Sequence, residues 1–275
     1  MSLQDRFEKA AEAIRQARAM VVTAGAGMGV DSGLPDFRGD HGFWNAYPMY
    51  QRLGINFVGA ANPANFEDDP AFGWGFYGHR THLYRETEPH AGFRMLQDWA
   101  ETFGQDSFVV TSNVDGQFQK AGYRNDQVLE VHGSIHHLQC LTPCCNAIWD
   151  NDETIPVDFE SMRAQHVPGC RHCSRAARPN ILMFGDYSWV ADRTRGQEMR
   201  FDNFLAQHRQ EPIVVIEMGA GTAVPTIRFM SERIGQGFSA TVIRINPREP
   251  RISGGHISLP CGALEGLQGI ETCLF

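Results

Sequence analysis

The sequence predicts an α/β fold in which a doubly wound, parallel sheet carries a small inserted zinc-ribbon module and a helical or loop insert. Short, almost wholly apolar runs recur along the chain, and such runs are typical of strands that are buried on both faces. Helix-like stretches separate several of these runs, which is the alternation of a parallel sheet. A cysteine-rich segment interrupts that alternation. The 275 residues are enough for one large domain with an insert.

The first half of the chain begins with an amphipathic helix and a buried strand. Apolar residues recur at helical spacing from Phe7 to Ala17, and the strand follows at 19–24. Residues 39–70 are rich in glycine, asparagine, proline and aromatic side chains without a clean period, so we expect an irregular segment there. Beyond it we expect two helices, at 71–85 and 91–102, and two strands, at 108–111 and 128–131.

The second half opens with a segment that cannot build a hydrophobic core of its own. Residues 139–179 hold five cysteines and few long apolar runs, so we expect a small zinc-binding module there. Apolar runs then resume and complete the sheet, which places the sheet domain at 1–138 and 180–275, with the helical or loop insert at about 39–105. The expected later elements are strands at 181–184, 212–217 and 240–245, with a helix at 224–234.

Composition and charge exclude several classes of protein. The formal net charge of -8 argues against a general affinity for nucleic acid. No apolar run approaches the ~20 residues that span a bilayer, and the N-terminal segment lacks the apolar core of a secretory signal. We therefore expect a cytoplasmic protein with no membrane or nucleic-acid partner, either a monomer or a weak oligomer. In a reducing compartment, seven cysteines favour metal binding or catalysis over disulfides.

The cysteines are spaced as in a zinc ribbon. Cys170 and Cys173 form a tight pair, and Cys140 forms a second pair with either Cys144 or Cys145. Four thiolates make a closed structural site rather than a catalytic site with an open position. The alternative is a redox dithiol at Cys170 and Cys173, which would leave the other pair without a purpose.

A glycine-rich block follows the strand at 19–24. Closely spaced glycines after a buried strand allow the backbone to approach a pyrophosphate, and the N-terminus of a following helix attracts that anion. This block runs from Gly25 to Gly39 and ends in Pro35-Asp36-Phe37-Arg38. The alternative is an ordinary glycine-rich turn, but such a turn needs no rigid proline, carboxylate, aromatic ring and guanidinium in succession.

Polar residues follow the next two strands, at the carboxyl edge where open α/β sheets bind their ligands. Residues 111–116 read Thr-Ser-Asn-Val-Asp-Gly, and residues 130–134 read Glu-Val-His-Gly-Ser. Because the ordinary pKa of histidine lies near 6.5, His132 is a natural general base near neutral pH. For His136 and His137, close by, a hydrogen-bonded structural role is the better interpretation.

These blocks, in this order, resemble the signature motifs of the sirtuin family. The glycine block is similar to its Gly-Ala-Gly loop followed by Ser-Gly-Ile-Pro-Asp-Phe-Arg-Gly, residues 111–115 to Thr-Gln-Asn-Ile-Asp, and residues 130–133 to Glu-x-His-Gly. The resemblance runs from about Ile14 to Ala263. It implies a Rossmann-like domain and an NAD-dependent protein lysine deacylase that consumes NAD, carries one structural zinc ion and acts on acyl-lysine proteins. Its products would be nicotinamide and O-acyl-ADP-ribose.

The resemblance also implies roles for individual residues. The catalytic set would be His132 as the base for a ribose hydroxyl, Asn113 to orient the ribose and a water, and Asp115 to bind the nicotinamide amide. Because a four-residue gap occurs in the family's first cysteine pair, the zinc ligands would be Cys140, Cys145, Cys170 and Cys173. The residues implied to bind the cofactor are Gly25, Ala26, Gly27, Asp36, Phe37, Arg38, Ser112, Asn113, Asp115, His132, Gly219, Ala220, Gly221, Asn246 and Ala263.

Two features concern the exact reaction. Ser112 stands where the family usually has a longer glutamine, so it reaches the ribose only through water. An NAD hydrolase or an ADP-ribosyltransferase is therefore the alternative function. Tyr77 and Arg80 lie one helical turn apart and resemble the pair that holds the acyl carboxylate in desuccinylating and demalonylating sirtuins. The alternative is a surface arginine beside a core tyrosine. The expected substrate-binding residues are Tyr77, Arg80, Leu182, Phe184 and Gly185.

Overall fold

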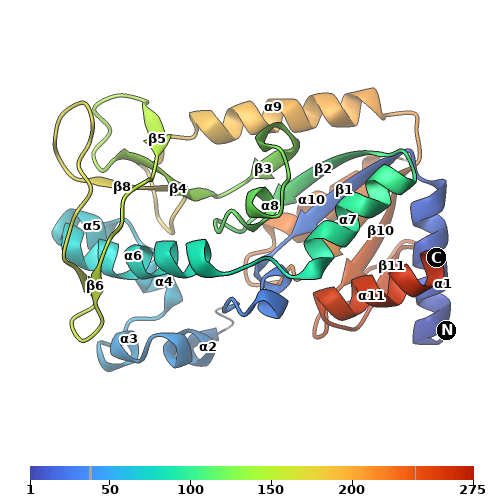
Figure 1. The fold of residues 1–275 in the computed structure, drawn as a ribbon, viewed down its shortest axis with the longest axis horizontal. Coiled ribbons are helices and arrows are strands. Elements are labelled where there is room, and N and C mark those ends of the chain that lie inside the picture. Colours follow the sequence, from blue (N-terminus) through green and yellow to red (C-terminus); the bar gives the residue numbers. More distant parts are fainter. Residues whose placement is uncertain (37–38, 239) are drawn as a thin grey trace.

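A six-stranded parallel sheet forms the larger part of the molecule (Figure 1). The computed structural model describes residues 1–36, 39–238 and 240–275. The strands lie in the order β11-β10-β9-β1-β2-β3, with every neighbouring pair parallel. The expected doubly wound α/β fold is thus confirmed. The strand bounds are β1 (Ala19–Ala24), β2 (Asp106–Thr111), β3 (Val128–Glu130), β9 (Ile213–Met218), β10 (Ala240–Ile245) and β11 (Ile257–Leu259).

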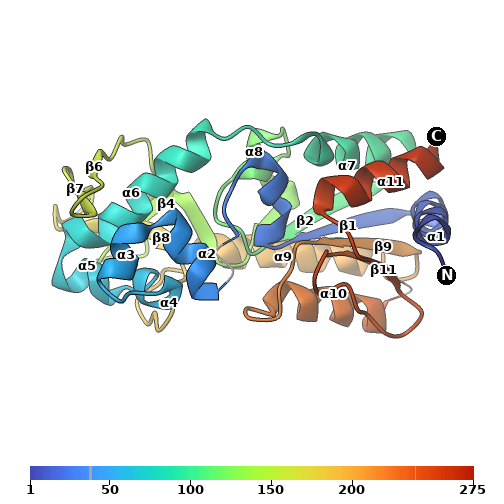
Figure 2. The ribbon, with the colours of Figure 1, turned by 90° about the horizontal axis from the view of Figure 1, so that it is seen from below.

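Helices cover both faces of this sheet (Figure 2). One face carries α1 (Leu3–Gln16), α7 (Ala91–Thr102) and α11 (Ala263–Leu274), and the other carries α9 (Asp192–Gln207) and α10 (Thr226–Gly237). Successive residues of a strand point to opposite faces, so Val22 of β1 packs in the first of these layers and Val21 in the second. Burial on both faces explains why the strands read as continuous apolar runs.

The remainder of the chain forms a second lobe with its own hydrophobic cluster. A three-stranded antiparallel sheet, ordered β5-β4-β8, packs there with five helices and with the small β6–β7 hairpin (Figure 1). The strands are β4 (Gly133–Cys140), β5 (Ile148–Asp150), β6 (Val157–Asp158), β7 (Arg163–Ala164) and β8 (Ala177–Ile181). The helices are α2 (Gly39–Ala46), α3 (Pro48–Arg52), α4 (Phe57–Ala60), α5 (Ala64–Asp68) and α6 (Pro70–Glu86). The remaining short elements are η1 (Ala26–Met28), η2 (Val30–Ser32), α8 (Gln117–Lys120) and η3 (Asn125–Gln127).

The expectation of an irregular segment at 39–70 is wrong. Four short helices occupy this segment, with lengths of 8, 5, 4 and 5 residues. Helices of one or two turns are too short to display a helical period. Aromatic packing stabilises them instead: the ring centroid of Phe43 lies 5.6 Å from that of Tyr50 and 5.8 Å from that of Phe76 in α6.

The strand expected at 181–184 is also wrong, because β8 ends at Ile181. The next residues leave the sheet and bond to loops instead. The N–H of Leu182 donates to the carbonyl of His132 at 2.9 Å, and the N–H of Phe184 donates to the carbonyl of Ala61 at 3.0 Å. This segment therefore bridges the two lobes. Among the described residues, no helix combines the length and the apolar character that crossing a membrane requires.

Glycines in α6 allow the 155–164 segment to pack closely on that helix. A Cβ added to Gly75 would lie 1.8 Å from the carbonyl oxygen of Met162, and one added to Gly78 would lie 2.8 Å from a methyl group of Ile155. Real Cβ atoms do not approach other atoms so closely, so a side chain at either position would force the segments apart. The two glycines thus fix how the hairpin meets the helix.

We expect Gly75→Ala to lower the free energy of unfolding by roughly 1–3 kcal/mol, because the added methyl group overpacks the contact with Met162. Chemical denaturation would measure it. Gly196→Ala in α9 is the matched control, since its nearest neighbour would be a flexible arginine tip at 3.8 Å. That control should leave stability unchanged or raise it by up to about 1 kcal/mol. Equal effects of the two substitutions would contradict the packing argument.

Candidate functional site

Two glycine loops meet at the carboxyl edge of the parallel sheet. β1 and β9 are neighbouring strands, with Ala24 opposite Met218, so the loops that follow them start side by side. The chain runs from β1 to β2 and β3 on one side and forms β9 to β11 on the other, and ligands bind at such a change of direction. The N–H of Gly27 donates to the carbonyl of Gly219 at 3.1 Å, and a Cβ on Gly219 would lie 2.4 Å from the Cα of Gly27. Glycine is required at 219 for a second reason, since its φ is +60°.

A cleft of about 630 Å³ opens at this point, between the large sheet and the second lobe. It brings together most of the residues predicted from the sequence. Those that line it are Gly25, Ala26, Asp36, Tyr77, Arg80, Ser112, Asn113, Asp115, His132, Leu182, Phe184, Gly219, Ala220 and Gly221. Phe37 and Arg38, predicted to bind the cofactor, lie outside the described residues.

Of the residues predicted to bind cofactor or substrate, four described ones lie outside the lining of the cleft: Gly27, Gly185, Asn246 and Ala263. Asn246 is buried and supports the loop after β9, because its amide donates to the carbonyl of Ala220 at 2.9 Å. Its side-chain oxygen accepts the N–H groups of Arg248 and Glu249, both of which line the cleft. Ala263 is buried at the first residue of α11, beside the large sheet.

Asn113 and His132 both line the cleft. The amide of Asn113 donates to the carbonyl of Gly25 at 3.0 Å, which ties the loop after β2 to the glycine loop after β1. His132 is half-buried between β3 and β4, and this burial lowers the pKa of its imidazole, although a hydrogen bond with the backbone of Ser112 opposes the shift. The imidazole is therefore neutral at pH 7 and can accept a proton.

Asp115 is the buried carboxyl group of the cleft. Burial raises its pKa to about 6, although the N–H of Gln117, which donates to Oδ1 at 3.0 Å, lowers it. The carboxyl group is thus mainly ionised at pH 7. Nε2 of His136 donates to the backbone oxygen of Asp115 at 2.8 Å and holds this turn in place. The structure thus gives His136 a hydrogen-bonded partner in the turn.

A buried ion pair holds the segment that carries Leu182 and Phe184. Arg178 donates to both carboxylate oxygens of Asp186, at 2.7 and 2.9 Å, and both side chains are wholly inaccessible to solvent. The same carboxylate accepts the N–H groups of Met183 and Ser188, at 3.3 and 3.0 Å. A single carboxylate therefore fixes the turn at both of its ends.

The cleft contains residues that sequence reasoning missed, among them Tyr84, Arg248 and Glu249. Tyr84 follows Arg80 by four residues on α6, so helical spacing could have placed it on the same face. Arg248 and Glu249 follow β10 at the carboxyl edge of the sheet, where ligand-binding residues are expected. Their position after a strand could therefore have indicated a binding role, although no motif marks them.

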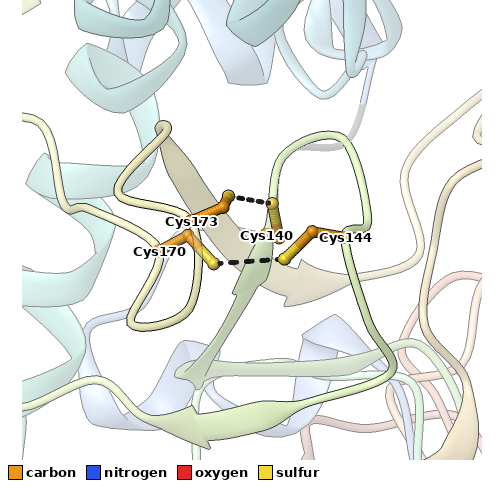
Figure 3. Close-up of side chains that lie close together, drawn as sticks. All are labelled: Cys140, Cys144, Cys170 and Cys173. Atoms are coloured by element: carbon orange, nitrogen blue, oxygen red, sulfur yellow. Dashed lines mark hydrogen bonds between the residues drawn. The ribbon is translucent and has the colours of Figure 1, made fainter.

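Four cysteines converge in the second lobe: Cys140, Cys144, Cys170 and Cys173 (Figure 3). Their sulfur atoms all lie within 4.8 Å of one another, and the Cys140–Cys173 and Cys144–Cys170 pairs are 3.7 Å apart. Four sulfurs at about 2.3 Å from a tetrahedral zinc ion lie about 3.8 Å from each other. The donor set and its spacing therefore fit one structural zinc ion.

The choice of Cys145 as the fourth ligand is wrong. The structure places the sulfur of Cys144 together with those of Cys140, Cys170 and Cys173, and among the described residues Cys145 is not part of this cluster. Adjacent side chains in a turn point in different directions, so only one of the two cysteines can face the other ligands. The turn after Cys140, whose thiol lies 2.9 Å from the carbonyl oxygen of Thr142, presents Cys144.

The profile of the Sir2 family matches residues 25–204, which cover the glycine loop after β1, the segment that carries His132 and the cysteine module. The chain belongs to the Sir2 family. An NAD-dependent protein deacylase of Candida albicans is 30% identical to this Sir2-family chain over 263 residues, covering 81% of each protein. An NAD-dependent protein deacylase of Aquifex aeolicus is 27% identical over 236 residues, covering 85% of each.

Solved structures share the fold of this Sir2-family chain. A Sir2 homologue in complex with NAD superposes with a TM-score of 0.70 at 24% identity, covering 98% of this chain and 95% of that one. A histidine mutant of a Sir2 homologue in complex with ADP-ribose gives a TM-score of 0.71 at 24% identity, covering 96% and 95%. The similarity extends over both lobes.

We expect Cys144→Ser to reduce bound zinc from about one ion per chain to well below one and to lower the melting temperature, because a structural site needs all four thiolates. Cys145→Ser is the matched control and should keep its zinc. Elemental analysis of the purified variants, with melting curves before and after chelation, would measure both effects. Zinc retained in Cys144→Ser but lost in Cys145→Ser would restore the ligand set chosen from the sequence.

Proposed function

We propose that this chain is an NAD-dependent protein lysine deacylase that releases nicotinamide and O-acyl-ADP-ribose. One observation carries the proposal: a Sir2-family chain brings a neutral histidine, an oriented amide and a buried carboxylate to the point where two glycine loops meet. The loops supply the close backbone approach that a pyrophosphate requires. The adjacent side chains supply a base and hydrogen-bonding groups for the sugar and the nicotinamide amide.

On this proposal the acyl-lysine carbonyl oxygen replaces nicotinamide on the ribose carbon of NAD, which is consumed as a substrate. His132 takes a proton from a ribose hydroxyl, which its lowered pKa permits at neutral pH. Asn113, anchored on the carbonyl of Gly25, orients the ribose and a water. Asp115 is mainly ionised at pH 7 and accepts a hydrogen bond from the nicotinamide amide.

The acyl-lysine peptide would enter between two segments that line the cleft from opposite lobes. These are the turn from Leu182 to Phe184 and the loop from Gly221 to Val224. Leu182 and Val224 are 38% and 43% exposed, so both present apolar surface at the mouth of the cleft. A peptide added as an extended strand is recognised chiefly through its backbone, which suits an enzyme with many protein targets.

The proposed acyl group is acidic, such as succinyl or malonyl. Tyr77 and Arg80 both line the cleft and are 1% and 7% exposed, so Arg80 is not a surface residue. Burial opposes the charge on Arg80, but neighbouring tyrosines Tyr84 and Tyr77 more than offset this, and the pKa of the guanidinium stays above its ordinary value. A buried cation of this kind favours a carboxylate over a neutral acetyl group.

The proposal also implies a reducing compartment such as the cytoplasm. The seven cysteines are free thiols, and four of them form the cluster that fits zinc. Zinc binds thiolates, so oxidation of this cluster would remove its ligands.

The test is incubation of the protein with NAD and matched acetyl-, succinyl- and malonyl-lysine peptides, followed by mass spectrometry of all products. We expect nicotinamide and deacylated peptide to appear in equal amounts. His132→Ala should slow this turnover by about 100-fold or more, because it removes the general base. His82→Ala, an exposed histidine on α6, is the control and should leave the rate unchanged.

Nicotinamide and free ADP-ribose released without peptide turnover would contradict deacylation. That result would indicate the alternative, an NAD hydrolase or ADP-ribosyltransferase, for which Ser112 is the motivating residue: it lines the cleft with a side chain shorter than the glutamine of the family.

The acyl preference has a separate test in Arg80→Met. We expect kcat/KM for succinyl-lysine peptide to fall by about 10- to 100-fold, the worth of a hydrogen-bonded charge pair, while acetyl-lysine turnover changes little. Arg94→Met, an exposed arginine on α7, is the control. Steady-state kinetics on both peptides would decide, and an unchanged ratio between them in Arg80→Met would remove the proposed role of this arginine.

A further inference from the structure

The hydroxyl group of Tyr84 holds the guanidinium group of Arg80 inside the cleft. Nε of Arg80 donates to this oxygen at 2.8 Å, and one terminal nitrogen donates to it at 2.5 Å. Tyr84 is 5% exposed and lines the same cleft as Tyr77 and Arg80. A guanidinium has five N–H donors in a rigid plane, so fixing two of them fixes the direction of the whole fork.

Three aromatic rings lie close to the guanidinium group of Arg80. Its central carbon lies 5.0 Å from the ring centroid of Phe76, 5.6 Å from that of Tyr77 and 5.2 Å from that of Tyr84. These distances are within the range of cation–π attraction. A long arginine side chain otherwise has large rotamer freedom, which it must lose to bind a ligand. In this cleft much of that freedom is lost before the ligand arrives.

The backbone beneath Tyr84 is fixed as well. The side-chain amide of Gln117, two residues after Asp115, donates to the carbonyl of Tyr84 at 3.2 Å. On the other side of α6, the close contacts at Gly75 and Gly78 seat the helix against the 155–164 segment. Tyr84 is thus held from both the sheet domain and the second lobe.

Tyr84 orients Arg80 without neutralising it. Burial raises the pKa of the Tyr84 phenol, so it remains a neutral group at physiological pH. A carboxylate in its place would cancel the positive charge that an acidic acyl group needs. A phenol that accepts two hydrogen bonds from Arg80 also keeps its own O–H as a donor.

We propose that Tyr84 is a positioning residue for acyl specificity: it presets the Arg80 guanidinium to receive the carboxylate of an acidic acyl-lysine. The inference rests on the proposed acyl preference and adds to it a residue outside the Tyr-x-x-Arg pair. It makes the recognition unit a Tyr-x-x-Arg-x-x-x-Tyr pattern on one helix face, formed by Tyr77, Arg80 and Tyr84.

The test is Tyr84→Phe, which removes one oxygen atom and keeps the ring. We expect KM for succinyl-lysine peptide to rise about tenfold with kcat nearly unchanged, since the lost hydrogen bonds involve a charged group. Acetyl-lysine kinetics should stay within about twofold, because a neutral acyl group has no use for the oriented cation. Tyr123→Phe is the matched control: Tyr123 is buried and donates to the carbonyl of Phe93 at 3.0 Å, beside the large sheet.

A double-mutant cycle separates positioning from a general structural effect. If Tyr84 acts through Arg80, then Tyr84→Phe added to Arg80→Met should cause no further loss on succinyl-lysine peptide. Melting curves of all variants accompany the kinetics. Equal losses on both peptides, or a full additional loss in the Arg80→Met background, would overturn the positioning role.

Kinetics of the wild-type protein distinguish an error in the proposed acyl preference from an error in the role of Tyr84. If the wild type turns over acetyl-lysine better than succinyl-lysine, both the proposed acyl preference and the role of Tyr84 are wrong. If the wild type prefers succinyl-lysine and Tyr84→Phe keeps that preference undiminished, only the role of Tyr84 is overturned.

Discussion

The backbone contact between two glycine loops is the constraint on which the rest of the site depends. The N–H of Gly27 bonds to the carbonyl of Gly219, and neither loop has room for a Cβ at the crossing. This contact exists because β1 and β9 are paired in parallel, with Ala24 opposite Met218, so the loops that follow them start side by side at the carboxyl edge of the sheet. The side-chain amides of Asn113 and Asn246 donate to carbonyls of these loops, so the loops fix where the adjacent walls of the cleft lie.

The second lobe completes the site from the other side. Its hydrophobic cluster joins the cysteine module, the short helices and α6, so the four-cysteine cluster and the arginine of the cleft belong to one packed unit. An ion held by the four cysteines would cross-link the two ends of residues 139–179, which bury their apolar side chains only against the rest of the lobe. The four-cysteine cluster does not line the cleft, but it belongs to the same packed unit as α6, which carries Tyr77 and Arg80.

Sequence reasoning reached the sheet and most of the cleft because both depend on local signals. Buried parallel strands read as apolar runs, and the polar motifs stand directly after them. The short helices of 39–68 carry no such signal, since each is stabilised by aromatic rings from other elements. Spacing alone could not decide between Cys144 and Cys145, because the direction of a side chain in a turn depends on tertiary contacts. Helical spacing could have placed Tyr84 on the same face as Arg80. The sequence does not show that Arg80 is buried, and without that fact the hydrogen bond between the two could not be predicted.

The buried pair of Arg178 and Asp186 has an evolutionary consequence. Losing one partner strands a charge in the interior, at a cost of about 3–5 kcal/mol, whereas replacing both together is far less damaging. These two positions are therefore expected to covary among descendants of this chain: both residues are replaced together, or both are kept. Tyr187, the next residue after Asp186, is fully exposed and under no such restraint. Single substitutions at this position are therefore expected to be nearly neutral for the fold and to accumulate independently, while the buried pair behind it stays unaltered.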